Sequence, residues 1–515
     1  MRKKWMGVVF RQRVFVIVIL LFQIIFLIYL IASTSRVHQI ISWFLNVVSI
    51  AVALYIVGKR EKSAYKLTWI FIILMFPIFG GLLYILFYAQ SNPVKFKKMQ
   101  KHIRECEQSC RPLFLLSGDV LPHLEQSREA CLPQVRYLQN TAGFPVYRHT
   151  RTEYYPSGET YFAGLTGALE KAEKYIFMEF FILNRGEMMN AVISILERKA
   201  REGLDVRVIY DDMGCFLTLP VHYKEHLERK GIKCSIFNPF RPIVSSLQNN
   251  RDHRKIVTID GKTAFTGGIN LADEYINAVE KYGHWKDSGI KIEGEAAWSL
   301  TLIFLKMWNR GKTYEQSDYL AFYPWAESAC TVASDGYVQP YADNPTDDEN
   351  VGEHVYIQII NNAKEYVYIN TPYLVVDENL ISALTLAAKS GVDVRIITPY
   401  RWDKWIVATT SRSYYRQFIN AGIKIYEYLD GFNHSKTFVS DDQIATVGTT
   451  NLDFRSLYLH FECGVLIYKG RTVKKVKDDF LATLPRCHQI SLADCSKSAA
   501  HSLTQDVLRL FAPLL

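Results

Sequence analysis

Acidic residues are almost missing from the first fifth of the chain. Residues 1–104 contain fifteen Lys and Arg but a single acid, Glu61, which gives this segment a net charge of +14. The formal charge of the whole protein is +9, so the remaining residues together carry −5. Strong nucleic-acid binding requires many cations on the folded body. The distribution therefore argues against a nucleic-acid partner and points to anionic lipid headgroups beside the N-terminal segment.

A disulfide framework and a zinc site are also missing. The nine cysteines are odd in number and scattered along the chain, whereas disulfide frameworks use even numbers at regular spacings. Cys106 and Cys110 are not followed by a second pair at zinc-ligand spacing. Asp211-Asp212 is interpreted as an acidic strand end rather than as a pair of metal ligands. We therefore expect structural thiols, no metal and no cofactor.

Three long runs without charge occupy the N-terminal segment, at residues 14–32, 40–57 and 67–89. Each is long enough to cross a hydrocarbon layer about 30 Å thick, and the first has no convincing signal-peptide cleavage site. Pro77 and Gly80-Gly81 break the third run, so it either crosses the membrane or dips in and returns. We predict two or three N-terminal transmembrane helices in a multi-pass protein of a bacterial cell membrane, with the remainder of the chain on the cytoplasmic face.

The remainder of the chain is duplicated. Short apolar runs alternate with helical patterns, which is typical of an α/β fold, and the same order of elements occurs twice. We predict a membrane region at 1–92, a linker at 93–135, and two homologous halves at 136–325 and 326–515. The matching segments are 174–183 with 365–374, 201–212 with 389–400, and 228–240 with 419–432.

One pattern, H-x-K-x4-D followed by Gly and Asn, occurs once in each half at identical internal spacing. A lone histidine in a strand is usually a satisfied polar residue, but five matched positions in both halves favour a functional site. In an alternating strand the histidine and lysine of each copy lie on one face. If the halves pack about a pseudo-twofold axis, both pairs converge in one cleft. The two sets are His253, Lys255, Asp260, Gly267 and Asn270, and His434, Lys436, Asp441, Gly448 and Asn451.

Two histidines and two lysines in one cleft suit a phosphodiester substrate. The lysines, with Asn270 and Asn451, can bind the non-bridging oxygens and stabilise a five-coordinate transition state without a metal. One histidine can attack phosphorus while the other, protonated, donates to the leaving oxygen. The covalent intermediate divides one displacement into two. Gly267-Gly268 and Gly448 are expected to let the backbone approach the phosphate.

Carboxylates are expected to orient the two imidazoles by fixing their tautomers. Asp287 follows His253 by 34 residues and Glu462 follows His434 by 28, each on the next strand-like segment. Asp260 and Asp441 are grouped with the catalytic residues as members of the repeated pattern. They come just after the alternating run, however, which favours a turn or ion-pair role over proton transfer.

These residues resemble the phospholipase D superfamily, which is defined by a pair of H-x-K-x4-D stretches. Within it the chain is similar to bacterial cardiolipin synthases, through "HRKIVTIDGKTAFTGGINLADEY", "TPYLVVDENLISALTLAAKSGVDVRIITP", "TTNLDFRSLYLHFE" and the terminal "PLL". The hydrophobic "LTWIFIILMFPIFGGLLYILF" also resembles that family's N-terminal region. Two departures are Ser435, where alanine is common, and His460, where asparagine is frequent.

The resemblance implies two phospholipase D-like α-β-α sandwich halves related by a pseudo-twofold, preceded by transmembrane helices. It also implies that one phosphatidylglycerol transfers its phosphatidyl group to another, which gives cardiolipin and glycerol. By the same resemblance His253 is the nucleophile and His434 the acid/base. Lys255, Lys436, Asn270 and Asn451 bind phosphate. The expected partners are phosphatidylglycerol and anionic membrane lipids, and no oligomer is needed to complete the cleft.

Three other functions remain open on the sequence alone. A phospholipase D-type hydrolase would use the same site but let water take the phosphatidyl group and release phosphatidic acid. Phosphatidylethanolamine as partner lipid is a variant of the synthase. A nuclease is disfavoured by the acidic body, and a non-catalytic membrane adaptor by the intact residue sets in both halves.

Overall fold

The computed structural model of the protein describes the chain from residue 36 onwards, except residues 60–61, 77–79, 90–100, 102–104, 106–109, 118–119, 128, 241–245, 311–315, 348, 497 and 515. The chain divides into two compact units. One consists of Met1–Phe96 and Phe240–Gln248, and the other of Lys97–Pro239 and Asn249–Leu515.

The described residues of the first unit include the helices α2 (Arg36–Gly58), α3 (Ser63–Met75) and α4 (Gly80–Ala89). Trp69 of α3 packs edge-on against Tyr84 of α4, with ring centroids 5.1 Å apart. The predicted run 40–57 lies within α2, run 67–89 is divided between α3 and α4, and run 14–32 lies outside the described residues. In the described part of the chain, no helix has both the length and the apolar character needed to cross a membrane. The predicted transmembrane helices stay a prediction.

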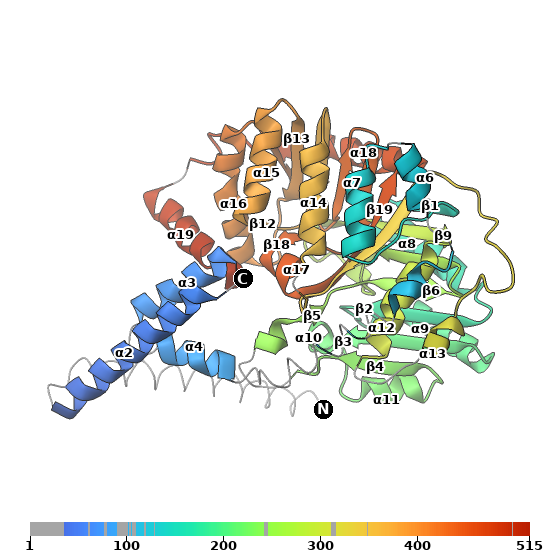
Figure 1. The fold of residues 1–515 in the computed structure, drawn as a ribbon, viewed down its shortest axis with the longest axis horizontal. Coiled ribbons are helices and arrows are strands. Elements are labelled where there is room, and N and C mark those ends of the chain that lie inside the picture. Colours follow the sequence, from blue (N-terminus) through green and yellow to red (C-terminus); the bar gives the residue numbers. More distant parts are fainter. Residues whose placement is uncertain are drawn as a thin grey trace. The chain divides into compact units, whose positions relative to one another are not determined.

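The second unit contains two sheets with the same strand order, which confirms the predicted duplication. The order is β1-β9-β7-β6-β2-β3-β4 in the first half and β10-β19-β17-β16-β11-β13-β14 in the second, where β20 is added at the edge. Figure 1 shows the second half in orange and red above the first half in green and yellow.

The strands of the first sheet are β1 (Thr150–Tyr155), β2 (Tyr175–Phe180), β3 (Asp205–Asp211), β4 (Lys233–Phe237), β6 (Ile256–Ile259), β7 (Thr263–Gly267) and β9 (Gly289–Gly294). Those of the second are β10 (Tyr337–Asp343), β11 (Tyr366–Asn370), β13 (Asp393–Pro399), β14 (Lys424–Tyr428), β16 (Thr437–Ser440), β17 (Ile444–Gly448), β19 (His460–Tyr468) and β20 (Cys487–Gln489). Short strands outside these paths are β5 (Arg251–Asp252), β8 (His284–Lys286), β12 (Leu374–Val375), β15 (Gly431–Asn433) and β18 (Leu452–Asp453).

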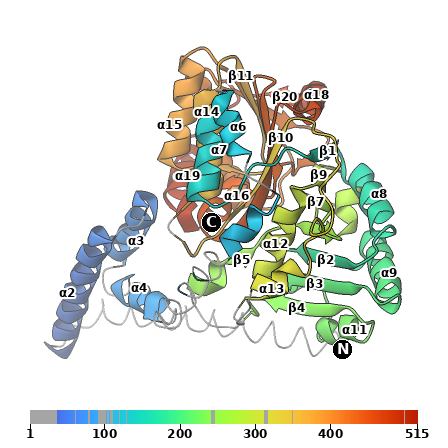
Figure 2. The same cartoon turned by 45° about the vertical axis from the view of Figure 1, so that its right-hand side comes forward.

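Helices cover both faces of each sheet, which explains why the central strands are apolar without alternation. All residues of β2 and of β11 are buried, as expected for parallel strands covered on both sides. In the first half α8 and α9 lie on one face and α12 on the other (Figure 2). In the second half α14, α15 and α16 cover one face and α18 the other.

The helices of this unit are α6 (Leu121–Gln126), α7 (Leu132–Arg136), α8 (Gly158–Leu169), α9 (Glu187–Arg201), α10 (Asp212–Cys215), α11 (Tyr223–Glu228), α12 (Ala297–Trp308), α13 (Gln316–Leu320), α14 (Val351–Asn362), α15 (Glu378–Lys389), α16 (Trp405–Asn420), α17 (Phe454–Tyr458), α18 (Arg471–Thr483) and α19 (Ala499–Leu510). Single turns of this unit are η1 (Tyr137–Thr141), η3 (Asp273–Ile276), η4 (Leu484–Arg486) and η5 (Ala512–Leu514), and η2 (Ser246–Asn249) belongs mostly to the first unit.

The segment predicted as a linker ends in helices that pack on the second half. Figures 1 and 2 both show α7 beside α14, and α6 packs against α7. The buried Gln134 amide of α7 donates to the carbonyl of Val355 in α14 at 3.1 Å. Residues that precede the first half in the sequence therefore pack against the second half.

Candidate active site

Two parallel strand pairs join the halves at the position of the histidines. β5, just before His253, pairs with the start of β19, so that Phe461 lies opposite Asp252. The backbone N–H of His253 then donates to the carbonyl of Phe461 at 3.0 Å. Continuing this register by one residue places Glu462 opposite His253.

The second histidine is placed in the same way by the other half. β15 pairs with β8, with Asn433 opposite Lys286, and the N–H of His434 donates to the carbonyl of Lys286 at 2.7 Å. The next residue along β8 is Asp287. Each histidine of one half therefore lies beside the carboxylate-bearing strand of the other half.

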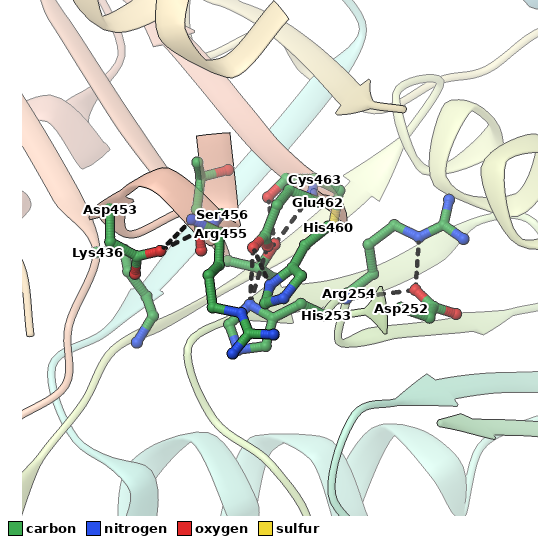
Figure 3. A network of polar contacts seen from close by, with 12 residues as sticks. Asp252, His253, Arg254, Lys436, Asp453, Arg455, Ser456, His460, Glu462 and Cys463 are labelled. Atoms are coloured by element: carbon green, nitrogen blue, oxygen red, sulfur yellow. Dashed lines mark hydrogen bonds and ion pairs between the residues drawn. The ribbon is translucent and has the colours of Figure 1, made fainter. Parts of the chain in front are cut away.

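The two imidazole–carboxylate contacts are crossed between the halves. The Nδ1 of His253 lies 2.9 and 3.1 Å from the two carboxylate oxygens of Glu462 (Figure 3). The Nδ1 of His434 lies 2.6 Å from Asp287 Oδ2. Occupying Nδ1 in this way leaves Nε2 of each ring for chemistry. The sequence distances of 34 and 28 residues identify the carboxylates but not their partners.

Burial keeps both histidines neutral in the ligand-free site. It lowers the pKa of His253 to about 3, although the nearby Glu462 acts in the opposite direction. It also lowers the pKa of His434 well below its ordinary value, and the charges of Lys436 and Lys255 add to the effect. Because a neutral imidazole has a free lone pair, either ring can act as a nucleophile at pH 7.

The two carboxylates differ in charge, which makes the histidines unequal. Burial raises the pKa of Asp287 to about 7. Burial acts in the same direction on Glu462, but His253 and the other donors around it outweigh burial and hold its pKa well below the usual range. The hydroxyl of Thr449 also donates to Glu462. A fully ionised carboxylate stabilises positive charge on the His253 ring better than a partly protonated one does on the His434 ring.

The two lysines are buried and face the same site. The ammonium group of each donates to the carbonyl oxygen of the histidine two residues earlier. Burial lowers the pKa of Lys255 to about 8 and that of Lys436 to about 7. Lys255 also depresses the pKa of both His434 and Lys436, so the two motifs share one electrostatic environment. An incoming phosphate anion would stabilise both ammonium groups.

The paired asparagines are not equivalent. Asn270 accepts from the N–H of Ile182 at 3.0 Å and donates to the hydroxyl of Tyr275 at 2.7 Å. The Oδ1 of Asn451 is buried and has no hydrogen-bond partner among the residues that the structure describes. Asn270 is therefore held in place by protein groups at both ends of its amide, whereas Asn451 keeps a polar atom available.

Asp260 and Asp441, which the repeated pattern groups with the catalytic residues, lie in turns at the far ends of the strands that follow the histidines. Each follows β6 or β16 and takes a positive φ, 53° and 52°. Asp260 accepts three backbone N–H groups, from residues 173–175, at 2.7–2.9 Å. Asp441 accepts three from residues 364–366 at 2.7–3.0 Å. Both carboxylates fasten the start of a central strand, so the turn interpretation holds.

The glycines of the repeated pattern, and Gly268 next to them, lie against other protein groups, where a Cβ would not fit. A Cβ on Gly268 would lie 2.1 Å from a carboxylate oxygen of Asp287. One on Gly267 or Gly448 would lie 2.5–2.6 Å from a carbonyl of the neighbouring strand. Gly268 thus allows Asp287 to reach His434.

His460 and Trp285 are two site residues whose roles the sequence did not predict. They occupy equivalent places, each two residues before the carboxylate of its strand. The His460 ring lies 5.5 Å from the His253 ring, and the Trp285 ring lies 5.5 Å from that of His434. Phe432 and Tyr275 also pack within 6 Å of His434. The Phe181 ring lies 5.1 Å from the His253 ring, so both histidines have aromatic neighbours. Their surroundings differ in that His253 lies beside a second imidazole and His434 beside an indole.

One set of side chains has the composition of a metal site. His253, His460 and Glu462 offer ligand atoms that all lie within 4.8 Å of one another. The hydrogen bond between His253 and Glu462 already accounts for much of this proximity. The charge of Lys255, which already lowers the pKa of His253, would also repel an added cation.

Two H-x-K segments, each between two strands, that meet between the duplicated halves of an α/β fold define a phospholipase D-like enzyme. Residues 165–300 and 356–484 match the family model described as "Cardiolipin synthase, PLD-like domain", and residues 44–87 match "Phospholipase_D-nuclease N-terminal". The chain is 33% identical over 488 residues to a cardiolipin synthase of Alkalihalophilus pseudofirmus, covering 92% of this chain and 95% of that protein. It is 42% identical over 464 residues to an uncharacterized protein of Streptococcus mutans, covering 90% and 99%.

The fold also resembles a solved structure, phosphatidylserine synthase of Haemophilus influenzae. The TM-score is 0.54 at 16% identity, over 74% of this chain and 97% of that one. At this identity the likeness concerns the fold alone. With the family model and the relatives together, the chain belongs to the cardiolipin synthase family of the phospholipase D superfamily.

Proposed function

We propose that this protein is a cardiolipin synthase that transfers the phosphatidyl group of one phosphatidylglycerol to another, giving cardiolipin and glycerol. The observation that carries the proposal is the pair of crossed histidine–carboxylate contacts, His253 with Glu462 and His434 with Asp287. Two oriented imidazoles flanked by two buried lysines match a two-step phosphodiester exchange. The match to cardiolipin synthase relatives supports phosphatidylglycerol as the substrate.

In the first step the Nε2 of His253 attacks phosphorus and the bond to the glycerol oxygen breaks. Glu462 holds the Nδ1 proton of His253 and stabilises the positive charge that develops on the ring. His434 donates its Nε2 proton to the leaving glycerol. The phosphodiester anion raises the pKa of His434 as it enters, so this ring is protonated only once substrate is bound.

In the second step the roles reverse. His434 takes the proton of a hydroxyl group on the second phosphatidylglycerol, and that oxygen attacks phosphorus. The phosphorus–nitrogen bond to His253 breaks, which releases cardiolipin and restores the free ring. Lys255 and Lys436 bind the non-bridging oxygens in both steps, and the free carbonyl of Asn451 orients a hydroxyl or ammonium donor.

Restricted access supports transfer to a lipid hydroxyl over transfer to water. Both histidines are only 7% exposed, so little solvent reaches the intermediate. An acceptor lipid held at the membrane surface has a high local concentration. We also propose that the N-terminal unit attaches the protein to a bacterial cell membrane by several passes, with the catalytic unit on the cytoplasmic face. One chain contains the complete site, so no oligomer is needed.

The test is to reconstitute the full chain in liposomes with phosphatidylglycerol and to resolve the products by lipid mass spectrometry. Cardiolipin and glycerol are expected from the wild type and from His488→Ala, an exposed histidine outside the site that serves as the control. Both products are expected to disappear in His253→Ala and His434→Ala. Phosphatidic acid without cardiolipin would identify a hydrolase and overturn the proposal.

A further inference from the structure

Two loops in equivalent positions border the histidines. One follows β3 and covers residues 212–222. The other follows β13 and covers residues 400–406. The first loop includes the short helix α10, and the second extends into the first turn of α16. Together they are named the cleft rim. Because β3 and β13 occupy the same place in sheets of the same strand order, both loops leave the sheet at the carboxyl ends of the parallel strands, where α/β proteins place their sites.

Each loop is tied to the strand segment that carries a histidine. Asp211, at the end of β3, accepts from the backbone N–H of Asp252 at 3.1 Å, one residue before His253. In the other loop Asp403 accepts from the hydroxyl of Tyr373 at 2.6 Å, and the Tyr373 ring packs against Phe432, two residues before His434. Lys404 also contributes to the lowered pKa of His434. The cleft rim therefore lies at the mouth of the site.

Large apolar side chains point outwards from both loops. Leu217 is 77% exposed, Trp405 52% and Trp402 44%. Exposed apolar groups gathered in one place usually mark an interaction surface. The exposed large apolar residues of the cleft rim are Met213, Leu217, Val221, Tyr400, Trp402, Trp405 and Ile406.

The composition of the 400–406 loop fits a lipid surface. Trp and Tyr are enriched where a membrane meets water, because their rings are apolar and carry a polar group. In this loop they alternate with the exposed Arg401 and Lys404. The single acid of this loop, Asp403, accepts a hydrogen bond from the hydroxyl of Tyr373. Arg401 also pairs with the exposed Glu280 at 3.7 Å. The other outward cation of the loop, Lys404, carries positive charge that complements an anionic headgroup layer.

The geometry of the site requires such a contact if the substrate is a lipid. The reacting histidines are nearly buried, and rings packed around His434 fill the space beside it. A phosphodiester can reach them, but its acyl chains have to remain outside. Apolar residues at the mouth would keep those chains in hydrocarbon while the headgroup enters.

We propose that the cleft rim docks on an anionic bilayer, with the apolar side chains of both loops in the headgroup region and Arg401 and Lys404 on lipid phosphates. The inference rests on the proposed lipid substrate. Phosphatidylglycerol then passes from the bilayer to the histidines without crossing water.

An activity test separates docking from chemistry. Full-length protein is assayed on phosphatidylglycerol in vesicles and, in detergent micelles, on a short-chain phosphatidylglycerol that is soluble as a monomer. Trp402→Ser/Trp405→Ser and Leu217→Ser/Val221→Ser are each expected to lower the vesicle rate by about tenfold, because buried apolar area is lost. The short-chain rate should stay within about twofold, since the chemistry is untouched.

The matched control is Leu386→Ser. Leu386 is 65% exposed but lies on α15, near the opposite end of β13, and both rates should match the wild type. Unchanged vesicle rates in the rim variants, or equal losses on both substrates, would overturn the proposal. If the wild type made no cardiolipin from either substrate, the proposed function would be wrong. The fluorescence measurement described next would then test membrane docking by itself.

That measurement is quenching of tryptophan fluorescence by lipids brominated in their acyl chains. The difference between the wild type and Trp402→Phe/Trp405→Phe isolates the signal of the two rim tryptophans from the seven others. We expect this difference signal to be quenched in vesicles that contain an anionic lipid, and less so after Arg401→Gln/Lys404→Gln. A difference signal that brominated lipid leaves unquenched would show that the rim faces protein or solvent instead.

Discussion

Glu462 lies 2.9 Å from Nδ1 of His253, although the two residues belong to different halves and are 209 positions apart. The reciprocal contact joins His434 to Asp287, 147 positions away. Each half thus supplies the carboxylate that orients the other half's histidine. Neither half holds an oriented imidazole by itself.

The crossing predicts which carboxylate serves the first chemical step. On a phosphatidyl p-nitrophenol substrate, whose leaving group needs no proton, Glu462→Gln is expected to lose the p-nitrophenol burst by about 10³–10⁴-fold, as His253→Ala does. Asp287→Asn and His434→Ala should keep the burst and fail in later turnovers. Stopped-flow absorbance measures the size and rate of the p-nitrophenol burst. If each carboxylate served the histidine of its own half, the two carboxylate variants would exchange phenotypes.

The depressed lysine pKa values predict how anion binding depends on pH. The free site holds Lys255 with a pKa of about 8 and Lys436 with a pKa of about 7, and a bound phosphodiester raises both. Binding therefore takes up protons above pH 7, and affinity falls as pH rises, by up to about tenfold per pH unit for each lysine. Inhibition by dimethyl phosphate, whose charge is constant in this range, measures the slope between pH 6 and 9.

A guanidinium keeps its proton throughout this range, so Lys436→Arg should flatten that slope even if the inhibitor binds more weakly. The corresponding change at an exposed lysine, Lys389→Arg, serves as the control. An inhibition constant that does not change between pH 6 and 9 in the wild type would show that both lysines are already charged in the free site.

Asp260 and Asp441 are expected to affect stability rather than chemistry. Asp260→Asn replaces one charged acceptor of three backbone N–H groups by a neutral amide, which should cost about 1–3 kcal/mol. Thermal unfolding in detergent measures the loss, and Asp441→Asn should behave alike. The rate per folded molecule should stay within about twofold of the wild type. A variant that folds normally yet has no activity would return these residues to the catalytic group.

Gly268 is expected to be essential to the His434–Asp287 contact. In Gly268→Ala the new Cβ would lie 2.1 Å from the Asp287 carboxylate, so this carboxylate must move from His434 and the rate should fall by about a hundredfold. Gly167→Ala on α8 is the matched control, because its Cβ would meet nothing within 4 Å. That change should stabilise the helix by about 0.5–1 kcal/mol and leave activity intact. Equal rates in the two variants would count against the contact.

Much of the catalytic unit could be predicted from the sequence, since duplication provides an internal comparison. Matched spacing identified the two H-x-K segments and the carboxylates Asp287 and Glu462, and the structure brings the histidines and carboxylates together. The segments 253–255 and 434–436 lie between strands rather than within the predicted alternating strand. The crossing could not be predicted, because residue spacing within a half contains no information about the neighbour of a strand across the interface. β5 and β15, which create it, are only two and three residues long.

The unequal surroundings of the two histidines also escaped prediction. Positions such as Trp285 and His460 become comparable only when the register of β8 and β19 against the histidine strands is known. Conversely, the pattern alone groups Asp260 with His253. In the structure β6 lies between the two residues, so Asp260 is at the end of the strand far from His253. Every second side chain of a strand lies on the same face, but this rule does not extend past a turn.

The crossed contacts also constrain how such a chain can change over generations. A substitution near Asp287 acts on His434 of the opposite half, and one near Glu462 acts on His253. A copy of either half that became separated would fold around a histidine lacking its carboxylate, and would recover function only by pairing with another copy. Fusion of the two copies into one reading frame makes that pairing permanent, and it lets each copy specialise, as Trp285 and His460 have done, without losing its counterpart.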